Sequence, residues 1–172
     1  SPNYLHDAHA RFALRSGADA ICEKPLVLNP WNIDGLLAVE KDTGQRINSI
    51  LQLRLHPSIL RLKEQQTEAG RSTKHDVELT YITSRGRWYS QSWKGDQKKS
   101  GGVATNIGVH FFDMLHFLYG DLQQSLVHCA DEMRSAGFLE YERARVRWFL
   151  SIDENDLPMQ VRSRGQRTYR SI

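Results

Sequence analysis

The chain has 172 residues, of which 40% are hydrophobic, 9% aromatic and 25% charged. This length suits one domain or two small ones, and the composition excludes collagen-like, low-complexity and intrinsically disordered architectures. The formal net charge of +3 is a weak imbalance that gives little sequence-independent attraction to phosphate, so we expect no nucleic-acid partner.

Three further features bear on the class of protein and its compartment. The longest apolar runs, such as residues 36–39, are far shorter than the roughly 18 to 20 residues of a membrane-spanning helix, so we expect no membrane partner. Cys22 and Cys129 are far apart and lack metal-type spacing, and no signal peptide is present, which favours reduced thiols in a cytoplasmic protein. The chain begins without methionine and stops within a strand-like pattern, so we expect a piece of a longer protein.

The first third of the chain alternates between helical and strand patterns. Asn29-Pro30 offers an N-cap followed by proline at the first helical position, and Gly17 and Gly44 lie where helices end. We expect helices over 4–16, 30–43 and 57–70, and strands over 18–23 and 47–53. Such alternation with short connections requires a parallel sheet flanked by helices, because parallel neighbours need a crossover. This part therefore resembles the tail of a doubly wound α/β domain.

From Asp76 the pattern changes to period two, which indicates a sheet with one wetted side, and we place a domain boundary within 54–75. A helix is expected from Thr105 or Asn106 to Gly120. Further strands are predicted over 122–130, 145–152 and 159–169, with 153–158 as a hairpin loop between the last two. Four basic residues are interpreted as the solvated face of the last strand rather than as a nucleic-acid site: Arg162, Arg164, Arg167 and Arg170. The fold class is therefore α/β plus α+β, with a mostly antiparallel second sheet and helices on one of its faces.

The first candidate for chemistry is Glu23-Lys24-Pro25, at the carboxyl end of a predicted parallel strand. Ligands usually bind at this edge of an open α/β sheet. A lysine beside a cationic cofactor or in a dry cleft has its ammonium form disfavoured, which makes it a better proton donor or acceptor near neutral pH. An ordinary surface lysine explains the pattern equally well. A cis Lys24–Pro25 bond, which X-Pro sequences allow, would fix the direction of the lysine.

The second candidate is the segment 101–113. At roughly 100° per residue, Asn106, His110 and Asp113 lie on one polar face of the predicted helix. The unperturbed pKa of His110 lies near neutrality, so it can take a proton from a substrate hydroxyl, and Asp113 could orient it. Two alternatives stay open: a hydrogen-bonded histidine at a helix–sheet contact, and a metal site of His110, Asp113 and His116. That spacing is not a common zinc pattern, so we expect no metal.

Between the two candidates, residues 85–104 form a long stretch without periodicity, and such loops tend to be functional or disordered. Its side chains suit a sugar ring and an anionic group, because aromatic rings offer apolar faces while cations pair with carboxylate or phosphate. The candidates for substrate binding are Trp88, Tyr89, Trp93 and Lys94, beside Arg85, Arg87 and Gln91. Ordinary loop packing explains the aromatic residues about as well.

Three short motifs occur in order: Pro2-Asn3 with His6, then Glu23-Lys24-Pro25, then the segment 106–113. They resemble the Pro-Asn-x-x-His turn, the Glu-Lys-Pro motif and the D-x-G-x-H-x-x-D motif of the glucose–fructose oxidoreductase and inositol dehydrogenase (Gfo/Idh/MocA) family of NAD(P)-dependent oxidoreductases. The resemblance implies the C-terminal part of a Rossmann domain over 1–54 and a truncated substrate-binding α+β domain over 55–172. It implies that Lys24 and His110 are catalytic, that Asn106 and Asp113 bind substrate, and that NAD contacts Pro2, Asn3, His6 and Glu23.

Within that family, segments 21–26, 52–57 and 145–150 look closest to bacterial UDP-N-acetyl-2-amino-2-deoxyglucuronate 3-dehydrogenases, which serve surface-polysaccharide synthesis. This resemblance implies NAD-dependent oxidation of the C3 hydroxyl of a UDP-sugar acid, with His110, assisted by Lys24, taking the hydroxyl proton. It also implies that Arg54 binds substrate and that a homo-oligomer assembles through the antiparallel sheet.

Two departures from the family pattern matter. Asn106 replaces the aspartate of the third motif. The glycine-rich turn that holds a pyrophosphate on a helix N-terminus, which precedes the first motif in the family pattern, does not occur in this sequence. We therefore expect the 172-residue chain by itself to bind NAD poorly and to be inactive, whereas the full-length parent is a dehydrogenase. The alternative is a non-catalytic sugar-nucleotide-binding or oligomerisation module that lacks the NAD-binding half.

Overall fold

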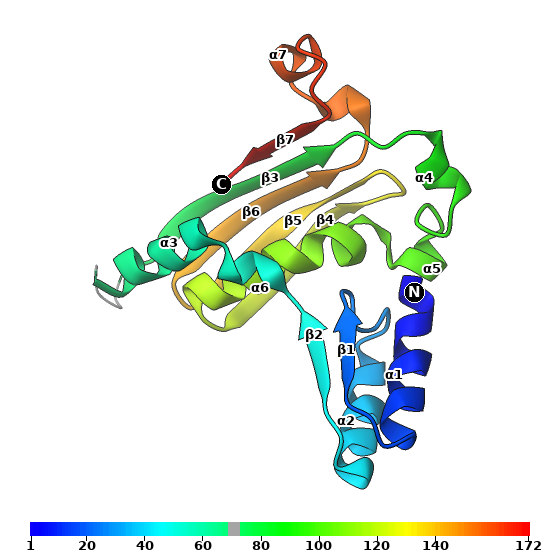
Figure 1. The fold of residues 1–172 in the computed structure, drawn as a ribbon. Helices are drawn as coiled ribbons and strands as arrows, with labels where there is room; N and C mark the ends of the chain where they lie inside the picture. The colour runs from blue at the N-terminus through cyan, green and yellow to red at the C-terminus, as the bar shows by residue number, and fades with distance from the viewer. Residues whose placement is uncertain (69–72) are drawn as a thin grey trace.

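The computed structural model describes residues 1–68 and 73–172, which form two lobes (Figure 1). The lower lobe in that view contains a two-stranded sheet, and the upper lobe contains a five-stranded sheet. The predicted end of the third helix near Gly70 lies outside the described residues. The proposed boundary between domains stays a prediction.

The lower lobe confirms the predicted alternation of helices and strands. Its elements are η1 (Asn3–Leu5), α1 (His6–Arg15), β1 (Ala20–Glu23), α2 (Trp31–Thr43) and β2 (Ile47–Ile50). The two strands are parallel, with Ala20 opposite Ile47 and Glu23 opposite Ile50. Helix α2 begins at Trp31 with Pro30 as its N-cap, one residue later than predicted, and the Asn29 side chain accepts a hydrogen bond from the backbone N–H of Trp31 at 3.1 Å. The carboxyl end of β1 therefore points toward the upper lobe (Figure 1).

The sheet of the upper lobe has the order β4-β5-β6-β3-β7. Its strands are β3 (His75–Thr83), β4 (Leu122–Ala130), β5 (Arg134–Tyr141), β6 (Ala144–Ser151) and β7 (Thr168–Ser171). Only the central pair, β3 with β6, is parallel, and the other three pairings are antiparallel. The expectation of a mostly antiparallel sheet is confirmed.

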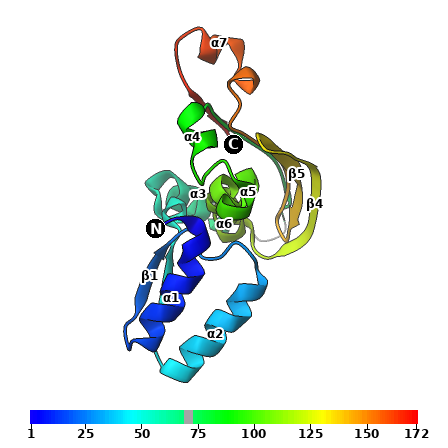
Figure 2. The same cartoon turned by 90° about the vertical axis from the view of Figure 1, so that its right-hand side faces the viewer.

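Helices cover one face of this sheet, as expected, while the opposite face carries none of the described helices (Figure 2). The helical segments after β2 are η2 (Gln52–Leu55), α3 (Pro57–Glu68), α4 (Arg87–Gln91), α5 (Gln97–Ser100), a π-helical turn (Ala104–Gly108), α6 (Val109–Tyr119), η4 (Glu154–Asp156) and α7 (Met159–Arg162). Within residues 1–68 and 73–172, no helix combines the length and apolarity needed to cross a bilayer.

The core of the upper lobe fixes α6 against the sheet. Leu115 and Leu118 of α6 and Val146 and Leu150 of β6 are each 0% exposed. Burial of a leucine side chain contributes about 1.5–3 kcal/mol relative to exposure, so this contact determines which face of α6 stays available for ligands. Tyr81 of β3 adds a ring contact to Phe111 of α6, with 4.9 Å between the ring centroids.

The structure corrects the prediction for the end of the chain. Residues 159–169 do not form one strand, because the backbone N–H groups of Val161 and Arg162 both bond to the Pro158 carbonyl in a helical turn. The segment 153–158 is not a hairpin loop either, because β3 lies between β6 and β7. Of the four arginines assigned to the solvated face of that strand, only Arg170 belongs to β7. Arg162 lies in α7, Arg164 in the turn after it, and Arg167 directly before β7.

Two further predictions are corrected. Strand β5 (Arg134–Tyr141) was missed, and residues 85–104, expected to be aperiodic, contain the short helices α4 and α5. The helix expected from Thr105 or Asn106 begins as an α-helix at Val109, after the π-helical turn.

Candidate functional site

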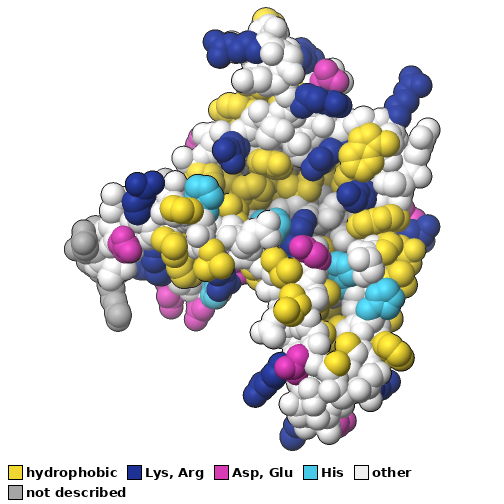
Figure 3. All heavy atoms as spheres, in the orientation of Figure 1, with side chains coloured by type: hydrophobic (Ala, Val, Ile, Leu, Met, Phe, Trp, Pro, Cys, Tyr) yellow, Lys and Arg dark blue, Asp and Glu magenta, His cyan; other side chains and the backbone are white. Residues whose placement is uncertain are grey.

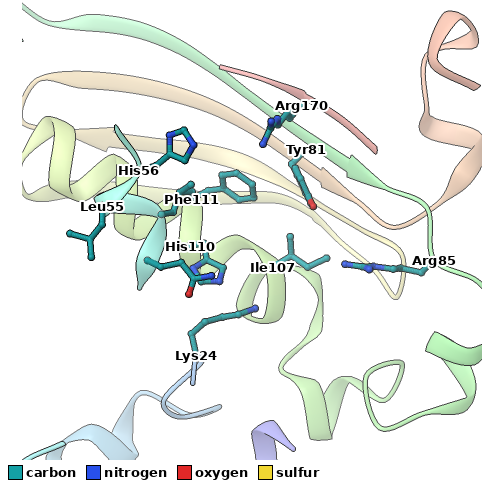
Figure 4. Close-up of a pocket in the computed structure, with 11 residues that line it drawn as sticks. Lys24, Leu55, His56, Tyr81, Arg85, Ile107, His110, Phe111 and Arg170 are labelled. Atoms are coloured by element: carbon teal, nitrogen blue, oxygen red, sulfur yellow. The ribbon is translucent and has the colours of Figure 1, made fainter. Parts of the chain in front are cut away.

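A cavity of about 540 Å³ lies between the two lobes, a size within the range of roughly 300–1,000 Å³ that is typical of ligand sites (Figure 4). Lys24 reaches it from the end of β1, and His110 reaches it from α6. The rest of the lining comes from η2 and the residue after it, from β3 and the loop after it, from the π-helical turn and α6, and from β7. The cavity therefore brings together the two residues that the sequence marked as candidates for proton transfer, from opposite lobes.

Lys24 is held by the backbone of the other lobe. Its Nζ donates a hydrogen bond to the carbonyl of Asn106 in the π-helical turn. The Lys24–Pro25 peptide bond is cis. Burial lowers the pKa of Lys24, the cationic Lys94 and Arg85 lower it further, and Glu23 acts in the opposite direction. The ammonium is thus easier to deprotonate than that of a surface lysine.

His110 keeps a neutral ring near physiological pH. Burial lowers its pKa, the charge of Lys24 lowers it further, and Glu23 and Asp113 oppose that shift. Its Nδ1 is buried and has no hydrogen-bond partner among the described residues. A neutral imidazole carries one free acceptor nitrogen, so His110 can accept a proton.

Asn106 connects three segments around the cavity. Its Oδ1 accepts from Nδ2 of Asn3 at 3.1 Å, and its Nδ2 lies 3.2 Å from the hydroxyl of Tyr89 as a donor. Asn3 also donates to the carbonyl of Ser100 at 2.9 Å. An ionised carboxylate in place of Asn106 could only accept, so the amide fits a position that both donates and accepts.

Asp113 does not orient His110 through a hydrogen bond. Its Oδ2 accepts from Nε of Arg54 at 2.8 Å, and its Oδ1 accepts from a second guanidinium N–H of the same arginine. This bidentate ion pair joins η2 to α6, and the side chain of Asp113 is 10% exposed. Neither residue lines the cavity of His110, although Asp113 lines a neighbouring hollow of about 600 Å³ together with Lys24. The role of Arg54 and Asp113 in substrate binding stays a prediction.

The segment 88–94, which contains Trp88, Tyr89, Trp93 and Lys94, lies beside the cavity rather than in its wall. Tyr89 is buried, and Trp88 is 53% exposed. Nζ of Lys94 lies 5.3 Å from the ring centroid of Trp88 and 5.7 Å from that of Trp93. None of these four side chains lines the cavity. Arg85, which comes just before them, does line it.

The residues that the resemblance assigns to NAD gather at the start of the chain and the end of β1. A second hollow, of about 520 Å³, is lined by Ser1, His6 and Glu23 among others. His6 is buried, with Nδ1 2.8 Å from the Pro25 carbonyl and Nε2 3.0 Å from the Ser1 carbonyl. Glu23 is exposed and offers acceptor oxygens at the carboxyl end of a parallel strand, which suits the hydroxyls of a dinucleotide. The acceptor oxygens of Glu23 therefore fit the hydroxyls of NAD.

The structure does not assemble the metal site that was considered as an alternative. His116 Nδ1 lies 3.1 Å from the Gly120 carbonyl. The described ranges 1–68 and 73–172 contain no group of three His, Cys, Asp or Glu side chains placed to bind an ion. His110 lines the cavity, whereas Asp113 is paired with Arg54.

Sequence reasoning missed several residues of the cavity wall. Tyr81 and Arg170 line the cavity with Gln52 and His56, although Arg170 is predicted to lie on a solvated face. A signal for Tyr81 existed in the alternation of β3. No local signal existed for Arg170, because its place depends on which strand β7 pairs with.

Comparison with known proteins adds independent evidence. Residues 1–50 match "Oxidoreductase family, NAD-binding Rossmann fold", and residues 68–159 match "Oxidoreductase family, C-terminal alpha/beta domain". Inositol 2-dehydrogenase of Rhizobium meliloti (strain 1021) is 33% identical in an alignment of 119 positions that covers 67% of this chain and 34% of that protein.

Solved structures of a dehydrogenase are similar over nearly the whole chain. The WlbA (WbpB) dehydrogenase from Thermus thermophilus, in complex with NAD and UDP-GlcNAcA, is 54% identical with a TM-score of 0.93, covering 99% of this chain and 55% of that one. Its complex with NAD and alpha-ketoglutarate gives a TM-score of 0.92 at the same identity. The WlbA dehydrogenase from Bordetella pertussis shares the fold, with a TM-score of 0.80 at 20% identity.

The chain spans 34% of the length of the inositol 2-dehydrogenase and 55% of the Thermus thermophilus dehydrogenase. The NAD-binding Rossmann domain and the C-terminal alpha/beta domain of the family are matched in that order along the chain. Lys24 of the Glu-Lys-Pro motif and His110 of the third motif meet at one cavity. On this evidence, the chain belongs to the Gfo/Idh/MocA oxidoreductase family.

Proposed function

We propose that this chain is part of an NAD-dependent dehydrogenase that oxidises the C3 hydroxyl of a UDP-N-acetyl-hexosaminuronic acid. The observation that carries the proposal is the convergence of Lys24 and His110, from two lobes, on one cavity of ligand size. The similarity to a dehydrogenase crystallised with NAD and UDP-GlcNAcA, at 54% identity, supports this substrate class.

The two residues divide the work of removing a proton. His110, with its lowered pKa, is neutral and accepts the proton of the sugar hydroxyl as the C–O bond becomes a carbonyl. Lys24, as an ammonium, provides a positive charge beside the developing alkoxide and so assists the transfer of the hydroxyl proton to His110. The hydrogen bond from Lys24 to the Asn106 carbonyl fixes the distance of the ammonium from α6.

NAD, when bound, supplies the acceptor for the hydride that leaves the same carbon atom. Glu23 would hold it, because its exposed carboxylate lines the hollow at the carboxyl end of β1, one residue before Lys24. His6 lines the same hollow, but both of its ring nitrogens already face backbone carbonyls, so it shapes the hollow rather than bonding NAD. The contacts proposed for Pro2 and Asn3 are indirect: Asn3 is buried and spends its amide on Ser100 and Asn106. These two residues shape the turn that carries His6.

The test uses the full-length protein with NAD and UDP-GlcNAcA. Replacement of His110 by Asn or of Lys24 by Met should lower kcat by about 10²- to 10⁴-fold, the usual contribution of a positioned acid or base. NAD affinity, measured by calorimetry, should stay within a few-fold. His128→Asn is a matched control, because His128 is exposed on β4 and lies away from the cavity.

Two outcomes would contradict the proposal. Normal turnover in both variants would remove the catalytic assignment. A wild-type protein that binds the sugar nucleotide and NAD but forms no NADH would instead favour a non-catalytic binding module.

The proposal includes a setting and an assembly. A role in surface-polysaccharide synthesis in the cytoplasm follows from the proposed substrate, and a homo-oligomer would form through the helix-free face of the sheet (Figure 2). That face presents Phe138 and Phe149, both partly exposed, and edge strand β4 exposes Leu126. Phe149→Glu should reduce the mass measured by sedimentation, whereas Phe12→Glu on α1, also exposed, should not; an unchanged mass in both would argue against this interface.

A further inference from the structure

The wall of the cavity carries positive charge without acidic residues. Lys24, Arg85 and Arg170 are among the eleven residues that line it, and none of the eleven is Asp or Glu. On the face shown in Figure 3, dark blue Lys and Arg side chains surround a hollow with an apolar floor. A concave apolar site with several cations and no acid is suited to a ligand that carries negative charge.

The pairing of β7 with β3 puts Arg170 on the cavity side of the sheet. Arg170 is directly opposite Tyr81, and directly opposite residues of paired strands project to the same face. The adjacent same-face pair, Thr83 and Thr168, confirms the register, because their hydroxyl oxygens lie 3.3 Å apart. Figure 4 shows Arg170 and Tyr81 reaching into the cavity from the sheet, while Lys24 enters from the other lobe.

Arg85 enters the same space directly after β3. Its guanidinium lies 5.9 Å from the ring centroid of the buried Tyr89, and its backbone N–H donates to the carbonyl of Ile152 at 3.2 Å. Its backbone is therefore held next to the end of β6, and its guanidinium lies near an aromatic ring that is itself fixed through Asn106. Figure 4 shows the side chain pointing toward the middle of the cavity.

Arg85 and Arg170 both have free hydrogen-bonding capacity. In the described part of the chain, no carboxylate lies within salt-bridge distance of either guanidinium, and neither side chain makes a hydrogen bond. Other arginines of this protein do find acids, as Arg54 does with Asp113. A planar guanidinium matches the oxygens of a carboxylate or a phosphate with two parallel N–H donors.

We propose that Arg85 and Arg170 form a subsite for an anionic group of the substrate, a carboxylate or a phosphate, on the sheet side of the cavity. This inference rests on the proposed function and specifies how the substrate is held. Anchoring the anion on the sheet side leaves the sugar ring between the two arginines and the Lys24–His110 pair, with its hydroxyl directed toward α6. The subsite makes Arg85 and Arg170 determinants of specificity for charged sugar nucleotides over neutral sugars.

The experiment compares ligands that differ in one charged group. Calorimetry on the full-length protein with NAD measures the affinity for three probes: UDP-GlcNAcA, UDP-N-acetylglucosamine, which keeps the diphosphate but has no carboxylate, and UDP. Arg170→Gln and Arg85→Gln should each weaken UDP-GlcNAcA by about 10- to 100-fold, the usual range for lost hydrogen bonds to a charged group. Arg164→Gln, exposed in the turn before β7, is the matched control and should bind like the wild type.

The pattern across the probes identifies the anion. If the subsite binds the carboxylate, only UDP-GlcNAcA loses affinity in the variants; if it binds phosphate, all three probes lose it by a similar factor. Arg170→Lys should recover part of the affinity, because the charge remains but the paired donors do not. NAD affinity and the circular dichroism spectrum should be unchanged, which separates loss of the subsite from loss of the fold.

The proposal is overturned if both glutamine variants bind all three probes as the wild type does while wild-type turnover is normal; the proposed function would then stand without this subsite. A wild-type protein that neither binds UDP-GlcNAcA nor reduces NAD with it would overturn the proposed function and the subsite together.

Discussion

Gly108 offers a sharp test of how closely α6 packs on the sheet, two residues before His110. A Cβ atom added at Gly108 would lie 2.7 Å from Cε2 of Phe112 and 2.8 Å from Cδ1 of Leu150. Both distances are well inside the ~3.5–4.0 Å of a normal carbon–carbon contact. Leu150 is fully buried, and the ring of Phe112 packs edge-on against Trp148 with 5.1 Å between centroids, so neither neighbour can move freely.

Replacing a helical glycine by alanine usually stabilises a protein, but we expect Gly108→Ala to destabilise this one. Alanine in a helix is favoured over glycine by about 1 kcal/mol, whereas overpacking of a core costs about 1–3 kcal/mol. Because the added atom would meet two side chains at under 3.0 Å, we take the upper half of the overpacking range, about 2–3 kcal/mol. We therefore expect a net loss of about 1–2 kcal/mol in the free energy of unfolding, measured by urea denaturation, together with reduced kcat because α6 carries His110.

Gly35→Ala in α2 is the matched control. Its added Cβ would meet Nη2 of Arg11 at 2.7 Å, but this atom is the far end of a flexible side chain that can move away. The control should retain stability or gain up to about 1 kcal/mol. If Gly108→Ala were as stable as the wild type, the packing around Gly108 would not be tight enough to constrain α6 against β6.

Four other predictions concern the ion pair, the histidine, to which two of them refer, and the core. Arg54→Ala should cost about 1–3 kcal/mol of unfolding free energy by leaving the carboxylate of Asp113 unpaired, and a double-mutant cycle with Asp113→Asn should show coupling; strictly additive losses would contradict the pair. Because the charge of Lys24 disfavours imidazolium, Lys24→Met should raise the pKa of His110, followed by NMR of the ring, while burial keeps that pKa below the usual value; an unchanged pKa would mean the two do not interact. In the wild type, kcat/KM should fall on acidification only below the ordinary histidine pKa of about 6.5, since protonation of the base removes activity; a fall beginning above it would contradict the assignment. Leu115→Ala should lower unfolding free energy by about 2–5 kcal/mol, and a loss under about 1 kcal/mol would mean that α6 is not anchored by this side chain.

Local sequence predicted the longer helices α1, α2 and α6 well because their signals lie within a few residues, whereas the short helices α4, α5 and α7 were missed. Gly17, Gly44 and Gly120 all have positive φ, at 80°, 72° and 87°, a conformation that favours glycine at or just beyond the end of a helix. The parallel pairing of β1 with β2 also followed from local reasoning, since a strand, a helix and a second strand with short connections have few alternatives.

Strand β5 was not predicted because contacts with its two neighbouring strands, rather than an alternating apolar pattern, determine its sequence. A Cβ at Gly137 would lie 2.2 Å from the carbonyl oxygen of Leu126 on one neighbouring strand and 2.8 Å from Cζ2 of Trp148 on the other. The small residue permits close approach across the sheet, and it weakens the apolar alternation by which a strand is identified. The false strand over 159–169 has a related cause, because a short helical turn such as α7 is too brief to show a period of its own.

Lys24 and His110 could be named as candidates from the sequence, because each occurs in a short motif. Their meeting at one cavity, the pairing of Arg54 with Asp113 and the arrival of Arg170 beside Tyr81 were decided by tertiary structure. Each of these depends on which segments pack or pair over long separations in the chain. A local pattern states that a strand or helix has an apolar face, but the partner that covers that face is selected by the packing of the whole chain.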